Sequence, residues 1–221
     1  MEPDESRNGS ISTGFTNGNW KNGHLVIDIE TKKEVSEVKG GWASKELLGV
    51  SCAVTFDMGS KRYQVYDDTK ADLFDLKSEI LMTRRVTTYN GWQFDYPVIW
   101  ARAPHWKNMG INLPSLMSSC DDILMRIWLA AGLNPYRFDK KTHSGYGLEA
   151  VCQSTLGEGK SGHGADAPIM YKSRRWGKLI SYCMDDVRLT AELSSFIDKN
   201  GYCVASGRKI TVPTWKEDTI K

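Results

Sequence analysis

The feature that most constrains the fold is a short apolar run that carries two acidic residues. Residues 24–30 read His-Leu-Val-Ile-Asp-Ile-Glu, and β-branched and aliphatic residues of this kind are typical of a buried strand. Asp28 and Glu30 are two positions apart, so on a strand their side chains leave the same face, roughly 6 to 7 Å apart along the chain. Two carboxylates this close repel each other unless a cation binds between them. Taken alone, such a pair is more often a solvated strand end.

Periodicity divides the rest of the chain into strands and helices. Apolar runs bounded by turns predict strands, of which the first three form an antiparallel meander and the last is a late edge strand: residues 24–30, 47–56, 62–66, 86–89 and 209–212. Apolar residues at three- and four-residue steps predict helices over residues 70–84, 122–131, 148–156 and 174–199. Ser118 or Ser119 is available to cap the second of these helices.

Length and composition set broad limits. A chain of 221 residues suits one well-buried domain. Residues 1–23 are rich in Gly, Ser, Asn and charge, which predicts a flexible arm followed by a single domain over residues 24–221. Hydrophobic residues make up 40% and charged residues 25%, as in ordinary globular proteins. The net charge of +2 does not indicate whether the protein binds nucleic acid, because a balanced total can hide a basic groove beside an acidic centre.

Cysteine usage and hydropathy bear on the compartment. The five cysteines include no C-x-x-C pair, which fits neither a disulfide framework nor a zinc knuckle. No stretch approaches the roughly 18 consecutive apolar residues that a membrane span needs. We therefore expect no membrane association and a reducing compartment, either the cytoplasm or, if the chain is viral, the cytoplasm of its host cell.

Two further segments place acids at defined positions. Residues 90–95 read Asn-Gly-Trp-Gln-Phe-Asp, where a strand ends and a helix opens near Asp95, although an acid there is often only a cap. Residues 182–187 read Tyr-Cys-Met-Asp-Asp-Val, in which Tyr182 and Asp186 are four apart and share one helix face. Asp185 points about 100° away from Asp186. Asp186 is therefore the better candidate.

In this order, the D-x-E, N-x-x-x-F-D and Y-x-x-x-D-V motifs resemble those of the DEDD exonuclease superfamily, tyrosine subtype (DEDDy), which includes proofreading domains of DNA polymerases. The resemblance covers roughly residues 25–190, and residues 122–187 look most like free-standing exonucleases of phages and bacteria. It implies an α/β, ribonuclease H-like fold with a mixed five-stranded sheet flanked by helices. It also implies a 3′-to-5′ exonuclease that releases nucleoside 5′-monophosphates from single strands or frayed 3′ ends, with DNA favoured over RNA.

The resemblance assigns catalytic roles to five residues. Asp28, Glu30 and Asp186 bind one metal ion, Asp28 bridges to a second, and Asp95 holds the second directly or through water. Carboxylates suit Mg²⁺ or Mn²⁺, whereas zinc would require His or Cys ligands, and the histidines are scattered. The fifth residue, Tyr182, orients or deprotonates the attacking water. Because tyrosine has a reference pKa near 10 and is a poor base, we expect it to position that water.

Contacts with the substrate follow from the same resemblance. The terminal nucleotide is expected to meet Thr31, Asn90, Trp92 and Phe94, although tryptophan and phenylalanine at such positions are more often core. Residues with a weaker case for binding phosphate are the loop at 160–168, Lys172, Arg174 and Arg175. Asp121 and Asp122 resemble an acid often found at the start of the following helix in these enzymes, and a plain helix-terminal charge explains them equally well.

Other activities remain open at this point. The same fold and the same four acids also serve structure-selective endonucleases and RNA-trimming exoribonucleases. A nucleic-acid-binding module that keeps the fold without catalysis is a third reading, and the full set of acids argues against it. The sequence does not set the oligomeric state.

Overall fold

The computed structural model describes residues 23–101, 119–159 and 166–215. Within these ranges a five-stranded sheet has the order β3-β2-β1-β4-β5. β1 pairs antiparallel with β2 and parallel with β4, while β2–β3 is antiparallel and β4–β5 parallel. The strands are β1 (His24–Thr31), β2 (Val50–Asp57), β3 (Arg62–Tyr66), β4 (Arg85–Thr88) and β5 (Cys120–Asp122). The predicted meander and the mixed α/β sheet of a ribonuclease H-like fold are both confirmed.

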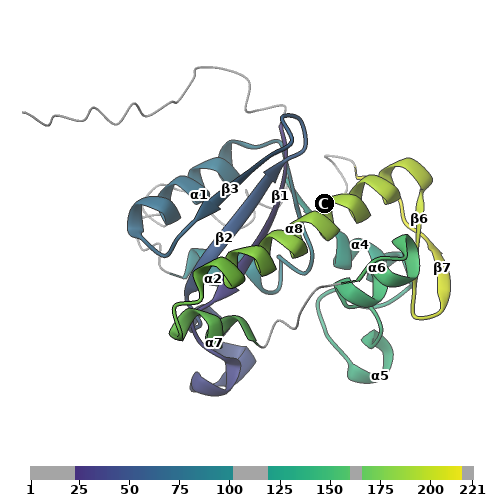
Figure 1. Cartoon of the computed structure of the whole chain (residues 1–221). Coiled ribbons are helices and arrows are strands. Elements are labelled where there is room, and N and C mark those ends of the chain that lie inside the picture. The colour runs from purple at the N-terminus through teal and green to yellow at the C-terminus, as the bar shows by residue number, and fades with distance from the viewer. Residues whose placement is uncertain (1–22, 102–118, 160–165, 216–221) are drawn as a thin grey trace, which may run out of the picture.

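Helices cover both faces of the sheet. On one face, α1 (Lys70–Met82) and α2 (Asp95–Trp100) contribute to a buried cluster that includes Leu25, Ile27 and Ile29 of β1. On the other face, α7 (Ala167–Lys172) and α8 (Trp176–Asn200) pack against Val26 of β1 and residues of β2. Figure 1 shows α8 crossing the sheet over β2 and β1. The strict alternation along β1 therefore turns its even-numbered side chains, including the two acids, toward α8.

A third buried cluster lies beside the sheet, where the C-terminal half of α8 meets several small elements (Figure 1). These elements are α4 (Ile123–Ala130), α6 (Leu148–Leu156), β6 (Tyr202–Ala205) and β7 (Arg208–Thr211). The short helix α5 (Lys140–His143) contacts α4 through His143 and Trp128. Between β1 and β2 the chain forms two 3₁₀ helices, η2 (Val35–Glu37) and η3 (Gly41–Leu47). None of the helices in the described ranges is long and apolar enough to cross a membrane.

The structure corrects the sequence-based prediction at three places. The late strand does not extend the main sheet, because β7 pairs with β6 in a separate hairpin. The strand predicted from residue 47 begins at Val50, since η3 and a left-handed Gly49 (φ 72°) precede it. The cap of α4 is Asp122, whose side chain accepts a hydrogen bond from Met125 N, in place of Ser119, while Ser118 lies outside the described residues. The predicted arm lies almost wholly outside the described residues.

Candidate active site

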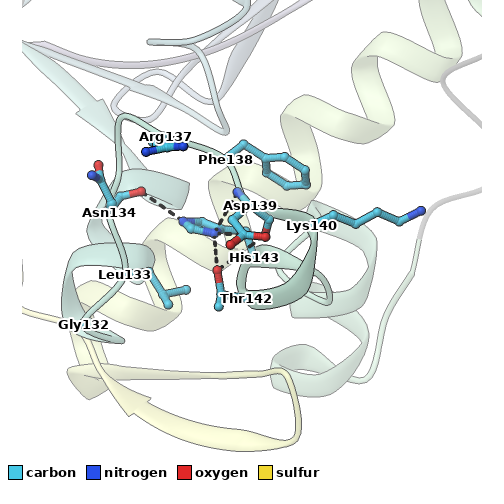
Figure 2. Close-up of a pocket in the computed structure, with 9 residues that line it drawn as sticks. All are labelled: Gly132, Leu133, Asn134, Arg137, Phe138, Asp139, Lys140, Thr142 and His143. Carbon is cyan, nitrogen blue, oxygen red and sulfur yellow. Dashed lines mark hydrogen bonds between the residues drawn. The ribbon is translucent and has the colours of Figure 1, made fainter.

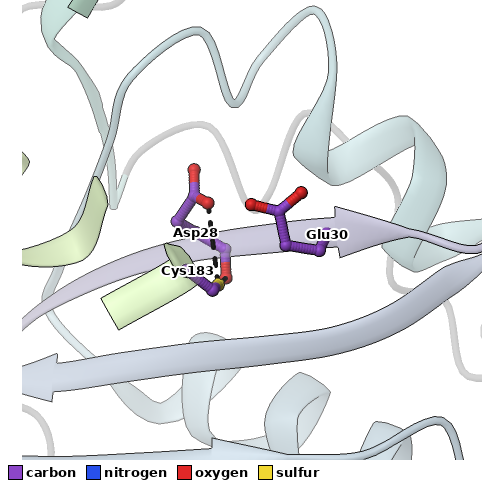
Figure 3. A group of neighbouring side chains, drawn as sticks. All are labelled: Asp28, Glu30 and Cys183. Atoms are coloured by element: carbon purple, nitrogen blue, oxygen red, sulfur yellow. Dashed lines mark hydrogen bonds between the residues drawn. The ribbon is translucent and has the colours of Figure 1, made fainter. Parts of the chain in front are cut away.

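Asp28 and Glu30 extend from the same face of β1, toward α8. Figure 3 shows both carboxylates on one side of the strand, with Cys183 reaching the strand from α8. One ligand atom from each of these three residues lies within 4.8 Å of the other two. Glu30 is 7% exposed, and Asp28 is half-buried. The expected pairing of the two acids is thus present, and the pair is close enough to hold one cation.

Cys183 completes this group without being a suitable ligand for a hard cation. Its thiol donates hydrogen bonds to the Asp28 carbonyl oxygen (3.4 Å) and to Asp28 Oδ2 (3.7 Å). Burial raises the pKa of Cys183 well above its ordinary value. A hydrogen bond between the Cys183 and Cys52 thiols and the charge of Asp28 act in the same direction. A metal-binding cysteine must be a thiolate, and Mg²⁺ and Mn²⁺ prefer oxygen. We therefore assign Cys183 to packing beneath the acids.

Tyr182 and Asp186 come from the face of α8 that approaches β1. Each is 5% exposed, as expected from residues four apart on one helix face. Asp185 instead lies 3.9 Å from Arg188 at the partly exposed edge of the helix. Of the two neighbouring acids, Asp186 lines the cavity described next and Asp185 does not.

A cavity of about 320 Å³ joins these elements. Its lining combines acids and a tyrosine with aromatic and aliphatic residues, several of them from the 3₁₀ region. The lining consists of Asp28, Ile29, Glu30, Thr31, Lys33, Glu34, Val35, Trp42, Leu48, Phe94, Pro168, Tyr182 and Asp186. Small-ligand sites commonly begin near 300 Å³ and combine an apolar wall with a few placed polar groups.

Trp42 is the most exposed aromatic residue among the lining residues that the sequence did not predict. It lies in η3, is 59% exposed, and meets Phe94 edge to face with ring centroids 5.4 Å apart. A large apolar ring so exposed at the mouth of a cavity is unusual, because most tryptophans are largely buried. An aromatic residue in a glycine-flanked stretch near the acids was the available signal, but a 3₁₀ segment has no helical or strand periodicity to reveal its position.

The segment that follows β4 is held by one buried carboxylate. Asp122 accepts hydrogen bonds from Asn90 N (3.0 Å), Trp92 N (2.9 Å) and Met125 N (3.2 Å). Burial raises the pKa of Asp122 to about 6 although these three bonds oppose the shift. The turn needs its Asn-Gly sequence, since Asn90 has a φ of 69° and a Cβ on Gly91 would lie 2.4 Å from the Thr88 side chain. Asp122 thereby fixes the backbone that leads into α2.

Asp95 opens α2 and is 3% exposed. Burial raises its pKa to about 7, and the charges of Asp122 and Asp186 add to the increase. Backbone hydrogen bonds from Asp95 itself and from Ile29 oppose the increase, and the bond from Ile29 places the Asp95 carboxylate next to β1. Among the described residues, its Oδ1 atom has no hydrogen-bond partner. Asp95 is close to the other acids, but it does not line the cavity.

The remaining candidates divide into those at the cavity and those elsewhere. Thr31 and Phe94 line it, whereas Asn90 and Trp92 do not. Trp92 packs against the apolar cluster under α1 and α2, which supports the core interpretation of this residue. Residues 160–165 of the predicted loop at 160–168 lie outside the described ranges, whereas Pro168 belongs to α7 and lines the cavity.

The other charged candidates have partners of their own. Lys172 Nζ lies 2.6 Å from Glu37 Oε2 and so joins α7 to η2. Arg175 Nε donates to Ser173 Oγ (2.8 Å), and Arg174 is an exposed residue with a φ of 55°. Burial alone would raise the pKa of Asp121, but the guanidinium groups of Arg126 and Arg85, at 2.8 and 2.6 Å, hold it below its usual value. Asp121 is therefore a structural ion-pair residue.

The donor set fits divalent cations that prefer oxygen. Asp28, Glu30 and Asp186 line one cavity. Asp95 lies close enough to Asp186 for the Asp186 charge to raise its pKa, and its buried Oδ1 has no hydrogen-bond partner among the described residues. Buried acids of like charge destabilise a fold unless they are protonated or bound to a counter-ion. This acidic cluster can hold metal.

Comparison with known proteins gives structural information only. No protein-family model matches the chain, and no curated protein sequence matches it significantly. The structure is similar to that of a family B DNA polymerase from the hyperthermophilic archaeon Pyrobaculum calidifontis, with a TM-score of 0.54 and 18% sequence identity. The two chains share a fold. The match covers 80% of this chain and 24% of the polymerase, so this chain corresponds to about a quarter of that protein.

Proposed function

We propose that this protein is a metal-dependent 3′-to-5′ exonuclease of the DEDD type, tyrosine subtype, that releases nucleoside 5′-monophosphates from single-stranded or frayed 3′ ends, with DNA favoured. The observation that carries the proposal is a single cavity lined by Asp28, Glu30, Asp186 and Tyr182 and by two aromatic rings. These rings belong to Trp42 and Phe94, and we call them the aromatic wall. Acids alone would indicate only a cation site. Their combination with a buried tyrosine and exposed rings fits hydrolysis of a nucleotide ester.

Asp28, Glu30 and Asp186 would hold one ion at the cavity, and Asp28 with Asp95 would hold a second. The all-oxygen donor set favours Mg²⁺ or Mn²⁺ for both positions. When bound, two such ions neutralise the phosphate and stabilise both the attacking and the departing oxygen. The protein supplies the fixed acids that keep this charge in place, on a strand and a helix whose packing leaves them little freedom.

Tyr182 would orient the water that attacks phosphorus. Its ring is buried while the residue lines the cavity, so the hydroxyl has a fixed direction relative to Asp186 one turn away. Attack forms a bond from the water oxygen to phosphorus and breaks the bond from phosphorus to the 3′ oxygen of the upstream nucleotide. The water proton leaves to solvent as the departing oxygen takes one up, and the released nucleotide keeps a 5′-phosphate.

The terminal nucleotide would bind between the acids and the aromatic wall. Thr31 and Glu30 lie at the end of β1, where they can meet the terminal 3′ hydroxyl, and Phe94 and Trp42 offer faces for the base. A cavity of about 320 Å³ with the acids on one side suits a single terminal unit better than a continuous strand. Paired ends must fray first, so single strands are expected to react faster.

The test uses 5′-labelled single strands of DNA and RNA with Mg²⁺ or Mn²⁺. Three substrates share one sequence and carry a 3′ hydroxyl, a 3′ phosphate or a closed circular backbone. Stepwise shortening of the first, with the other two resistant and mononucleotide 5′-phosphates as products, supports the proposal. Cleavage of the circle would establish an endonuclease, and faster digestion of RNA would establish an exoribonuclease.

A matched pair of variants then links the activity to the site. Asp186→Ala removes an acid that lines the cavity, whereas Asp185→Ala removes its neighbour at the exposed edge of the same helix. We expect the first to lose at least about a hundredfold in kcat and the second to behave as wild type. Equal activity of the two variants would contradict the assignment. Binding of strands by wild-type protein without any metal-dependent hydrolysis would instead identify a silent binding module.

A further inference from the structure

A second cavity, separate from the acidic one, is formed by the stretch of chain that connects α4 to α6. Its volume is about 590 Å³, and one continuous segment forms it (Figure 2). The lining residues are Gly132, Leu133, Asn134, Arg137, Phe138, Asp139, Lys140, Thr142 and His143. None of them takes part in the exonuclease reaction proposed above. We call residues 132–143 the distal segment.

Buried hydrogen bonds fix the shape of the distal segment. His143 is 5% exposed, its Nε2 lies 3.0 Å from the Asn134 carbonyl oxygen, and its Nδ1 accepts a hydrogen bond from Asp139 N at 3.2 Å (Figure 2). The imidazole ring also meets Trp128 edge to face, with centroids 4.6 Å apart. The segment is thus held from inside by one histidine, although most of its side chains face solvent.

Aromatic and basic residues lie close together among the exposed side chains of the distal segment. Tyr136 is 65% exposed and Phe138 is 58% exposed, with Arg137 between them. Lys140 and Lys141 follow, also exposed, and within the described part of the chain none of the three basic side chains makes a salt bridge. The segment's one acid, Asp139, is engaged in capping α5 through a 2.9 Å bond from Lys141 N. The surface is positively charged and carries two largely exposed rings, of which Phe138 also contacts Trp128 and His143, with ring centroids 6.4 and 5.8 Å apart.

A hydrogen bond connects the distal segment to a residue next to the acidic cavity. Gln93 Nε2 donates a 2.6 Å hydrogen bond to the Pro135 carbonyl oxygen. Gln93 directly precedes Phe94, which lines the acidic cavity and meets Trp42. The aromatic wall of one cavity and the backbone of the distal segment are therefore neighbours, so a strand whose end occupies the first cavity can continue toward the second.

We infer that the distal segment binds the single strand of nucleic acid upstream of the terminal nucleotide. Bases stack on exposed aromatic rings regardless of sequence, while arginine and lysine neutralise phosphates between them. Alternating rings and cations over Tyr136–Lys140 offer both contacts within a few residues, whereas an acidic peptide would use the cations and leave the rings without partners. The inference rests on the proposed exonuclease and assigns the part of its substrate that is not being cleaved.

The test compares long and short strands. Binding of 5′-fluorescein oligothymidylate of twelve and of three nucleotides is measured by fluorescence anisotropy in EDTA, and hydrolysis of both is followed with Mn²⁺. The variant is Tyr136→Ala with Phe138→Ala. Its matched control is Lys70→Ala with Phe74→Ala, a basic and an aromatic residue exposed on α1. Melting temperatures of all proteins establish that they are folded.

Loss of two stacking rings is expected to raise Kd and KM for the twelve-nucleotide strand at least about tenfold. The trimer should bind and react as with wild type, and the control variant should change neither value. An Arg137→Ala, Lys140→Ala variant should also lower the salt dependence of binding by about one unit of log Kd per log salt. Unchanged affinity for the long strand in both distal-segment variants would overturn the inference, as would equal competition by polyglutamate.

The inference and the proposed function fail in different ways. If wild type hydrolyses the trimer and the distal-segment variants bind the long strand normally, only the inference is wrong. If wild type binds the long strand through the distal segment yet hydrolyses neither substrate, the inference holds and the exonuclease proposal is wrong.

Discussion

Replacing Asp95 by asparagine is expected to stabilise the metal-free protein. The carboxyl group is 3% exposed, and burial together with the charges of Asp122 and Asp186 raises its pKa from 3.8 to about 7. A folded-state pKa above the unfolded value means that the folded protein loses stability as pH rises through that range. Since one pKa unit corresponds to about 1.4 kcal/mol, the charged group costs about 4 kcal/mol at pH 8. Asparagine keeps the shape without the charge.

The assay is thermal unfolding in EDTA from pH 4 to pH 8. A change of 1 kcal/mol shifts the melting temperature of a chain of this size by about 2 to 4 °C, so the variant should melt about 8 °C or more above wild type at pH 8. The difference should be small near pH 4, grow up to pH 7 and stay level above it. Asp185→Asn, which alters a partly exposed acid, serves as the control and should shift little.

Added Mn²⁺ provides the second half of this test. A cation bound at Asp95 removes the electrostatic penalty, so Mn²⁺ should raise the melting temperature of wild type at pH 8 more than that of Asp95→Asn. A variant that melts at or below the wild-type temperature at pH 8, or whose advantage is independent of pH, would refute the reasoning. That result would mean that the Asp95 carboxylate is already compensated in the metal-free protein.

Three other changes probe separate parts of the structure. Tyr182→Phe should lower kcat about a hundredfold and leave KM and strand binding unchanged, because only the hydroxyl contacts the attacking water; a raised KM with normal kcat would indicate a binding role. Trp42→Ala should raise KM for single strands about tenfold, whereas Leu47→Ala, equally exposed on η3 but away from the cavity, should not; identical KM values would remove Trp42 from the site. Gly91→Ala should destabilise by about 1 to 3 kcal/mol in urea unfolding, since its Cβ would lie 2.4 Å from a threonine hydroxyl, while Gly177→Ala, in open space on α8, should not destabilise.

Strong periodicity explains why much of the site could be predicted from the sequence. The pairing of β1 is regular from Leu25 to Glu30, so the two acids had to share a face, and the four-residue step in α8 fixed Tyr182 beside Asp186. Both placements depend only on local geometry. The packing of α8 across β1, which turns the two faces toward each other, follows from the apolar stripe of the helix.

Features without a local period could not be predicted in the same way. Trp42 lies in a 3₁₀ segment, and the three-residue strand β5 is too short to show an alternation. The partner of β7 is set by tertiary packing, so its sequence looked like an edge strand of the main sheet. The position of Asp95, outside the lining of the cavity, follows the turn that Asp122 holds, which no pattern near Asp95 reveals.

The alternation in β1 also limits how this protein can change in length. Its odd-numbered side chains fill the core under α1 and α2, while Asp28 and Glu30 face α8. Inserting or deleting a single residue between Leu25 and Glu30 would exchange the two faces, because the side-chain period of a strand is two residues. The acids would then point into the apolar core, and isoleucine side chains would point toward α8 in their place. Variation in β1 is therefore restricted to substitution, and added or lost residues can be accommodated only in the segments before and after the strand.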